Sequence, residues 1–202
     1  LGNKNLLERA IELLIDFGVE EISINVHHLA DQIKKFIDNN NYKIKFTISD
    51  EKDTLLDTGG GILKGTKLFK ESPFIVINPD TLWRKDYLDE IKNLEKLYYE
   101  EKKPCLLVVH KKLSFDKSFK GDFNIKNNLI SRDKSNEFIF TGLQILNRSA
   151  FSSVKSKIFS MNDVWNHLIN SNYLIAYESK QNFYHINTKK MYDKILKFNI
   201  IY

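Results

Sequence analysis

Several residue types and patterns are scarce in this chain, and each scarcity excludes something. Cys105 is the single cysteine among 202 residues, so no internal disulfide can form, which suits a reducing compartment. No apolar run reaches the roughly eighteen residues of a membrane span, and the first residues show no signal peptide. With 3 prolines and 8 glycines, the chain has no low-complexity segment or long linker. We therefore expect one cytoplasmic domain over residues 1–202, with no membrane partner.

Positive charge is in modest excess, with a formal net charge of +5 at pH 7. A basic balance can indicate nucleic acid, anionic lipid or phosphorylated ligands as partners. The lysines alternate with acidic residues, as in residues 92–96 (Lys-Asn-Leu-Glu-Lys), and no arginine-rich stripe with interleaved aromatics occurs. We expect no nucleic-acid partner. The alternative, a nucleic-acid-binding domain, predicts an affinity that falls steeply with salt.

Hydrophobic periodicity predicts alternating helices and strands. Helical spacing indicates helices over 3–17, 29–37, 62–69, 86–101, 161–169 and 188–198, and apolar or alternating runs indicate strands over 21–26, 43–48, 73–77, 105–109, 173–176 and 183–186. Between residues 121 and 146, short alternating strands joined by polar turns indicate an antiparallel insertion. The predicted fold class is α/β: a Rossmann-like mixed, mostly parallel sheet flanked by helices, with a small antiparallel insertion.

The chain opens on a helix, whereas a doubly wound domain usually opens on a central strand whose carboxyl end carries the nucleotide loop. We therefore expect an N-terminally incomplete domain, with a first strand and loop that precede Leu1.

Residues 57–62 (Asp-Thr-Gly-Gly-Gly-Ile) place three consecutive glycines where a helix is expected to begin. Glycine lets a ligand lie against the backbone, and helix N-terminal amides favour oxygen acceptors. A flexible turn that caps a helix explains the same residues equally well.

Residues 78–80 (Asn-Pro-Asp) follow an apolar strand, at the position where open α/β sheets bind ligands. A carboxylate there can hold Mg²⁺, which prefers oxygen ligands and bridges phosphates. An Asx turn is the structural alternative.

Four motifs in register carry a resemblance to a known family. Asp57 to Ile62, Asn78-Pro79-Asp80, Gly121-Asp122-Phe123 and Phe140-Thr141-Gly142-Leu143 follow one another at the expected spacing. The chain resembles the sugar-1-phosphate nucleotidyltransferases, most closely the branch with N-acetylmuramate 1-phosphate uridylyltransferase and mannose-1-phosphate guanylyltransferase-like proteins.

The resemblance implies a role for each matched position. Gly60 and Gly61 would lie against the nucleobase, Asn78 would contact the nucleotide, and Asp80 would ligate Mg²⁺. The sugar would be held by Asp122, which Gly121 lets approach, and by Gly142. A hairpin corner at 121–122 and a strand bulge at Gly142 are the structural alternatives.

The chain departs from the family in two places. The family's Gly-x-Gly-x-Arg loop and Pro-Lys-Pro segment, whose Arg and Lys stabilise the transferring phosphoryl group, are absent, so the catalytic cations are expected before residue 1. The family's second Mg²⁺ ligand, an Asp, is replaced by His185 in residues 184–188 (Tyr-His-Ile-Asn-Thr). Imidazole suits Mg²⁺ less well than a carboxylate does, so His185 either contributes a metal contact, binds a phosphate or packs.

We therefore expect a nucleotidyltransferase that joins an NTP (UTP favoured, GTP next) to a sugar 1-phosphate with Mg²⁺ as cofactor, in sugar activation for cell-wall or surface polysaccharides. Residues 1–202 alone are expected to be inactive. The alternative is a catalytically degenerate module that binds nucleotide or sugar phosphate.

Overall fold

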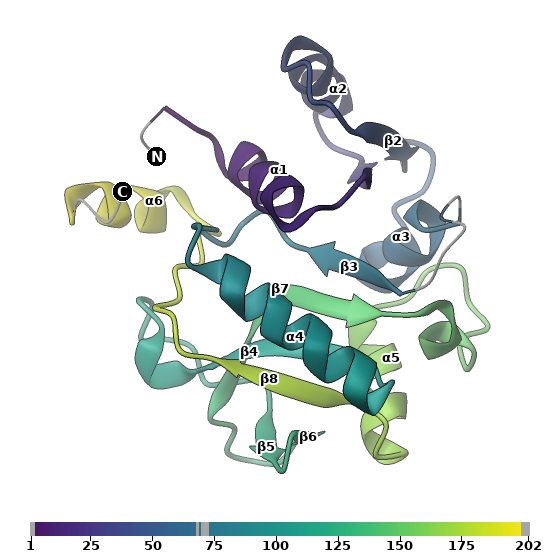
Figure 1. Ribbon diagram of the computed structural model, residues 1–202, viewed down its shortest axis with the longest axis vertical. Helices are drawn as coiled ribbons and strands as arrows, with labels where there is room; N and C mark the ends of the chain where they lie inside the picture. The colour runs from purple at the N-terminus through teal and green to yellow at the C-terminus, as the bar shows by residue number, and fades with distance from the viewer. Residues whose placement is uncertain (1–2, 68, 70–72, 199–202) are drawn as a thin grey trace.

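A computed structural model of the chain describes residues 3–67, 69 and 73–198 (Figure 1). The helices are α1 (Leu6–Phe17), α2 (Ala30–Asn39), α3 (Asp57–Gly65), α4 (Tyr87–Glu101), α5 (Met161–Asn170) and α6 (Lys189–Lys197), with short 3₁₀ turns η1 (Lys111–Leu113) and η2 (Arg148–Phe151). The strands are β1 (Glu21–Val26), β2 (Lys45–Asp50), β3 (Phe74–Ile77), β4 (Cys105–His110), β5 (Asn124–Lys126), β6 (Leu129–Ser131), β7 (Phe138–Leu146) and β8 (Ile175–Ser179).

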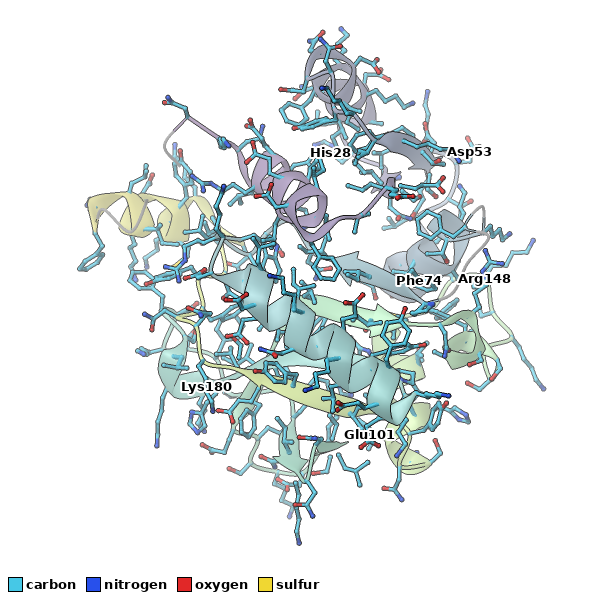
Figure 2. The ribbon with its side chains drawn as sticks, in the orientation of Figure 1. His28, Asp53, Phe74, Glu101, Arg148 and Lys180 are labelled. Atoms are coloured by element: carbon cyan, nitrogen blue, oxygen red, sulfur yellow. The ribbon has the colours of Figure 1, made fainter. Side chains whose placement is uncertain are left out.

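The strands form two separate sheets. β1 and β2 are a parallel pair joined through α2, and the other six strands lie in the order β3-β7-β4-β8-β6-β5. Figure 1 shows the β1–β2 unit, with α2, standing apart from the larger sheet beside α1 and α3. In Figure 2, His28 and Asp53 lie in this outlying unit, whereas Phe74 lies on β3. β1 and β2 run parallel and are connected by α2, so they form the strand–helix–strand unit that the alternation predicts.

The expected mostly parallel sheet is wrong. In the six-stranded sheet only β4 and β8 pair in parallel, and the β3–β7, β4–β7, β6–β8 and β5–β6 pairs are antiparallel. Two of these pairs arise because β7 inserts between β3 and β4, and the other two because β5 and β6 form an antiparallel hairpin that extends the sheet beside β8. A strand covered on both faces is a continuous apolar run whatever its direction, so the sequence pattern could not reveal this orientation.

Local sequence signals explain where the helices begin and end. Asn5 and Glu8 form a capping box at the start of α1, and Gly18 ends it in the left-handed conformation at φ +104°. Ser160 and Asp163 form a second capping box at α5. These paired signals account for the agreement of α1 and α5 with the predicted positions.

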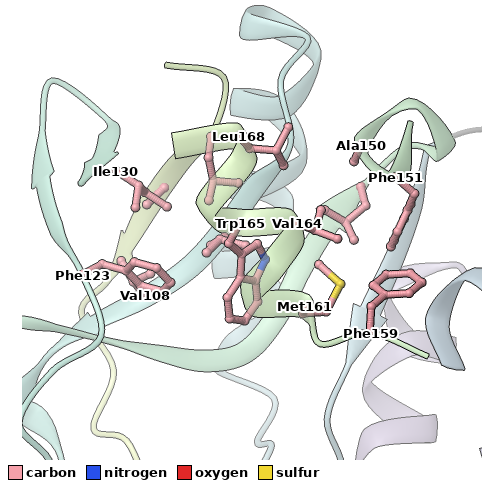
Figure 3. Packing of buried hydrophobic residues seen from close by; sticks show 14 of the residues in the cluster. Val108, Phe123, Ile130, Ala150, Phe151, Phe159, Met161, Val164, Trp165 and Leu168 are labelled. Carbon is pink, nitrogen blue, oxygen red and sulfur yellow. The ribbon is translucent and has the colours of Figure 1, made fainter. Parts of the chain in front are cut away.

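The core lies on both faces of the larger sheet, covered by α4 on one side and α5 on the other. Alternate residues of β4 divide between them: Cys105 and Leu107 pack in the α4 cluster, and Leu106 and Val108 in the α5 cluster. Figure 3 shows Val164, Trp165 and Leu168 of α5 gathered with other members of this second cluster. Helices on both faces thus bury residues 105–109 of β4.

Most predicted elements are confirmed, and two differ. α3 begins at Asp57, so the three glycines lie inside the helix and do not precede it. It ends at Gly65, before the predicted end near Phe69. Residues 183–186 form only isolated bridges, Thr81 with His185 and Ser114 with Phe183. None of the described helices is both long and apolar enough to span a bilayer.

The single thiol is predicted to be chemically inert in the folded protein. Cys105 is 0% exposed, and its burial raises the pKa of the thiol well above its ordinary value. We expect no labelling by a thiol-specific disulfide reagent at pH 8 in the native state, and one labelled thiol per chain after unfolding in guanidinium. Native labelling at the unfolded rate would contradict the burial.

Candidate functional site

Asn78 and Gly142 meet at the end of β3. The Asn78 amide donates a hydrogen bond to the Gly142 carbonyl oxygen at 2.7 Å. Gly142 has φ +94°, and a Cβ on it would stand 2.9 Å from the Asn78 Cβ. The β4–β7 register shifts between Leu107 and Val108, so Gly142 lies in a bulge of β7. The bulge glycine therefore lets the Asn78 backbone and side chain come close to β7.

Asp80 and His185 lie opposite each other on two neighbouring segments. Thr81 pairs with His185 in an isolated antiparallel bridge, and the Ile186 amide donates to the Asp80 carbonyl oxygen at 2.7 Å. The His185 Nε2 stands 3.8 Å from the Asp80 Oδ2. The imidazole also packs on aromatic rings, with centroids 6.1 Å from Phe183 and 5.7 Å from Phe119. His185 thus packs and faces Asp80 at the same time.

Asp80 has the properties of a Mg²⁺ ligand. Its Oδ1 is buried and makes no hydrogen bond, although 44% of the side chain is exposed, and a carboxylate oxygen of this kind needs a partner. Among the described residues no group of three His, Cys, Asp or Glu side chains is placed to hold a metal. The site therefore suits Mg²⁺ as nucleotide enzymes use it, with one or two protein ligands and the remainder from phosphates and water.

The glycines of α3 are packed against protein groups. The Gly59 and Gly60 amides donate to the Phe159 carbonyl oxygen at 3.0 and 3.2 Å. A Cβ on Gly60 would stand 2.4 Å from the Lys157 carbonyl oxygen, and one on Gly61 would stand 2.7 Å from the Glu51 Oε1. Close packing therefore explains these glycines without a ligand, and their role at a nucleobase stays a proposal.

Glu51 and Asn25 are polar residues of this region that the sequence motifs missed. Glu51 is 5% exposed; it accepts hydrogen bonds from the Asn25 Nδ2 at 2.7 Å and the Leu56 amide at 3.0 Å. The Asn25 Nδ2 also donates to the Gly61 carbonyl oxygen at 2.7 Å. The available signal was position alone, since Glu51 directly follows a strand. This network ties the ends of β1 and β2 to the first turns of α3.

Gly121 and Asp122 occupy a corner before β5. Gly121 has φ +89°, and a Cβ there would stand 2.4 Å from the Asn136 carbonyl oxygen, so the backbone itself demands glycine. The exposed Asp122 accepts a hydrogen bond through Oδ2 from the Phe140 amide at 2.9 Å. Phe140 is two residues before Gly142, so this carboxylate is tied to the strand that contacts Asn78.

A cavity of about 890 Å³ joins several of these positions. Gly61, Asn78, Asn25 and Glu51 line it, and Gly142 contacts Asn78 directly. Gly60, Gly121, Asp122, Asp80 and His185 are not among its lining residues. The structure thus brings the Asn78 and Gly61 motifs to one cavity and leaves the Asp122 corner outside it.

A second hollow, of about 610 Å³, gathers positive charge from separate parts of the chain. Five lysines line it, Lys111, Lys112, Lys117, Lys120 and Lys134. The Lys111 ammonium stands 2.7 Å from the Glu137 Oε1 and lowers the pKa of that carboxyl group. The fold therefore concentrates charge that is dispersed in the sequence.

Comparison with known proteins identifies the architecture as the α/β fold of sugar-1-phosphate nucleotidyltransferases. HddC from Yersinia pseudotuberculosis superposes with a TM-score of 0.72 and 24% identity over 95% of this chain and 84% of that one. A UDP-glucose pyrophosphorylase complexed with UDP-glucose gives 0.75 and 19%, covering 98% and 88%. The inositol-1-phosphate CTP transferase from T. maritima gives 0.73 and 15%, covering 96% and 83%.

Among curated proteins, the chain is similar to the N-acetylmuramate alpha-1-phosphate uridylyltransferase of Caulobacter vibrioides, with 33% identity over 86 residues. That match covers 41% of this chain and 36% of the length of the relative. No family model matches the chain. The fold is thus the one the motifs indicated, and the resemblance to the uridylyltransferase branch is supported over part of the chain.

Proposed function

We propose that the natural protein transfers a nucleoside monophosphate from an NTP to a sugar 1-phosphate and releases pyrophosphate. The observation that carries the proposal is the end of β3, where Asn78 lines the cavity and Asp80 keeps a buried carboxylate oxygen without a partner. Open α/β sheets bind ligands outside the carboxyl ends of their strands, and a carboxylate there can hold Mg²⁺, which supports the proposal. Activation of sugars for cell-wall or surface polysaccharides is the process such a reaction serves.

In the proposed reaction, an oxygen of the sugar 1-phosphate attacks the α-phosphorus of the NTP in line. The new P–O bond forms as the bond to the β-phosphate bridging oxygen breaks, and pyrophosphate leaves with the electron pair. Asp80 would hold Mg²⁺, which supplies charge neutralisation at the phosphates. Asn78 would orient the nucleotide, with Gly142 leaving room for it. Catalysis of this kind rests on positioning and electrostatics, and needs no covalent enzyme intermediate.

We propose UTP as the preferred nucleotide and GTP as the next. The similarity to a uridylyltransferase supports UTP, and the structure of HddC with GMP-PN supports a guanine nucleotide as runner-up. Calorimetric titration of the full natural protein with each NTP and Mg²⁺ is expected to give the tightest binding for UTP. Equal, weak binding of all four nucleotides would refute a base-selective site.

The lysine-lined hollow makes one control necessary in that titration. A nucleic-acid-binding protein would bind an oligonucleotide with an affinity that falls steeply between about 50 and 200 mM salt. We expect NTP binding without such oligonucleotide binding. Salt-sensitive binding of the oligonucleotide, with no NTP binding, would favour the nucleic-acid function instead.

His185 supports a second candidate function, a binding module that has lost catalysis. An imidazole stands 3.8 Å from Asp80, in the position where the resembled family has a second carboxylate. Substitution His185→Asp distinguishes the two: a degenerate module gains turnover with Mg²⁺, whereas an active enzyme already turns over with histidine.

We expect residues 1–202 alone to turn over at least about 10²-fold more slowly than the full natural protein, because loss of transition-state charge stabilisation costs that much or more. The same product assay on the two purified chains tests this. Nucleotide-sugar formation at equal rates would show that residues 1–202 supply every catalytic group.

A further inference from the structure

Arg132 is a half-buried arginine whose charge meets no carboxylate. It directly follows β6, and its guanidinium donates hydrogen bonds to the Asn166 Oδ1 and the Asn162 Oδ1, both at 2.6 Å. These two asparagines lie four residues apart on α5 and therefore on one face of the helix. Among the described residues, no acidic side chain forms an ion pair with this guanidinium. Its hydrogen-bond partners are thus neutral amides.

Two aromatic rings hold the Arg132 guanidinium in place. Its Cζ lies 4.6 Å from the centroid of the Phe123 ring and 6.0 Å from that of the Trp165 ring. Both rings are buried, and they contact each other edge to face with centroids 5.7 Å apart (Figure 3). Burial lowers the pKa of Arg132, because water solvates its charge less than that of a free arginine. A cation fixed in this way is preorganised for an anionic ligand.

Arg84 provides a comparison, because it lies over a ring and also has a carboxylate. Its Cζ is 5.4 Å from the centroid of the Tyr184 ring. Its guanidinium is paired with Asp86, at 3.3 Å from Nε to Oδ1 and 2.6 Å from Nη2 to Oδ2, which is the fork-like geometry that suits a carboxylate. Arg132 uses two of its five N–H groups in the described residues. It therefore keeps donors for the carboxylate of a ligand.

Two carboxylates in this part of the chain are engaged elsewhere. Asp133 accepts hydrogen bonds from the Ser135 amide at 2.8 Å and the Asn124 Nδ2 at 3.0 Å. Burial lowers the pKa of Arg132, and the negative charge of Asp122 offsets only part of that effect. Asp122 is therefore near, but it does not neutralise Arg132. Its charge also disfavours a phosphate monoester at Arg132, with a charge of about −1.5 to −2, relative to a singly charged carboxylate.

We propose that Arg132 binds a carboxylate group of the sugar 1-phosphate, so that the acceptor is an acidic sugar. This identification of the ligand rests on the proposed function, in which Asp122 contacts the sugar. Arg132 is not among the residues that line the cavity with Asn78, whereas the charge of Asp122 reaches it. In the proposed reaction the reacting phosphates lie with the Mg²⁺ of Asp80. The anion at Arg132 is therefore a second group, carried by the sugar ring.

Matched pairs of acceptors test for the carboxylate. Glucose 1-phosphate and glucuronic acid 1-phosphate differ only in the group at C6. N-acetylglucosamine 1-phosphate and its 3-O-carboxymethyl derivative differ only in the group at O3. Calorimetric titration of the full natural protein is expected to show about 10- to 100-fold tighter binding of the acid in at least one pair, as charge-assisted hydrogen bonds provide. Tighter binding of glucose 1,6-bisphosphate than of either acid would overturn the carboxylate in favour of a second phosphate.

Substitution of Arg132 tests whether this side chain causes the preference. Arg132→Gln removes the charge and keeps a donor for Asn162, so the acid should bind only as tightly as its neutral partner, whose affinity stays unchanged. Arg132→Lys keeps the charge and loses the planar fork, so part of the preference should remain. Arg84→Gln is the matched control. It removes an arginine that already has a carboxylate partner, and the preference should persist in full.

Three results would overturn the proposal. They are equal affinity within both pairs, a preference for the acid that survives in Arg132→Gln, and a loss of stability in that variant that weakens the acid and the neutral sugar alike. The last result would mean that Arg132 only fastens the hairpin of β5 and β6 to α5. Product formation from neutral sugar 1-phosphates without any acid preference would refute this inference alone. No binding of any sugar 1-phosphate would refute the proposed function as well.

Discussion

Replacing Asp80 by alanine is expected to lower kcat of the full natural protein by about 10²- to 10³-fold, because the change removes a carboxylate that would hold Mg²⁺ at the phosphates. The free energy of unfolding is expected to stay the same or rise, since the change also removes a buried oxygen that has no hydrogen bond. Initial rates of pyrophosphate release and urea unfolding curves measure the two effects. Activity lost without stability lost is the signature of a functional carboxylate.

Asp16→Ala is the matched control for Asp80→Ala. Asp16 has a similarly exposed side chain, 40% against 44% for Asp80, and its Oδ2 stands 3.6 Å from the Lys85 Nζ. An exposed pair of this kind contributes little, so activity should persist. If Asp80→Ala keeps full activity with Mg²⁺, or if Asp16→Ala loses as much, the proposed metal position is wrong.

The second large effect is expected from Gly142→Ala. A non-glycine residue at φ +94° carries roughly 1–3 kcal/mol of backbone strain. Its Cβ would also stand 2.9 Å from the Asn78 Cβ, and such overpacking adds about 1–3 kcal/mol. We expect the free energy of unfolding to fall by about 2–6 kcal/mol and nucleotide affinity to weaken as Asn78 is displaced.

Gly18→Ala is the control that separates backbone strain from the steric contact with Asn78. Gly18 has φ +104° and nothing within 4 Å of the position of its Cβ, so alanine there brings the strain without the clash. It should lower the free energy of unfolding by the strain alone, about 1–3 kcal/mol, and leave nucleotide affinity unchanged. Equal losses in both variants would show that Asn78 and Gly142 are not coupled.

The sequence predicted the elements well where local signals were strong. Helical spacing of apolar residues predicts α1 and α5, which the structure shows to begin with capping boxes at Asn5 and Ser160. The apolar run at 105–109 predicts a buried strand. The direction of the strands could not be predicted from the sequence. β7 lies between β3 and β4 through long-range pairing, which leaves no local pattern in the sequence.

In the candidate site, too, residues within sequence motifs could be predicted, and residues placed by long-range packing could not. Asn78 and Gly142 belong to motifs visible in the sequence, and the structure places them in contact. The glycines of α3 were misplaced, because helix propensity argues against three glycines within a helix and only packing against residues 157–159 and Glu51 explains them. Glu51 itself carries no motif, since a carboxylate after a strand is usually exposed.

The most direct test of the proposed reaction follows the label of a UTP radioactive at its α-phosphate. Incubated with the full natural protein, Mg²⁺ and a panel of sugar 1-phosphates, the label should move into a nucleotide-sugar, with one pyrophosphate formed for each product and none without a sugar phosphate. The same reaction with GTP labelled at its α-phosphate tests the second proposed nucleotide, and a lower rate than with UTP is expected. Label that stays in the nucleotide with every NTP and sugar phosphate, or appears as UMP whether or not a sugar phosphate is present, would contradict nucleotidyl transfer.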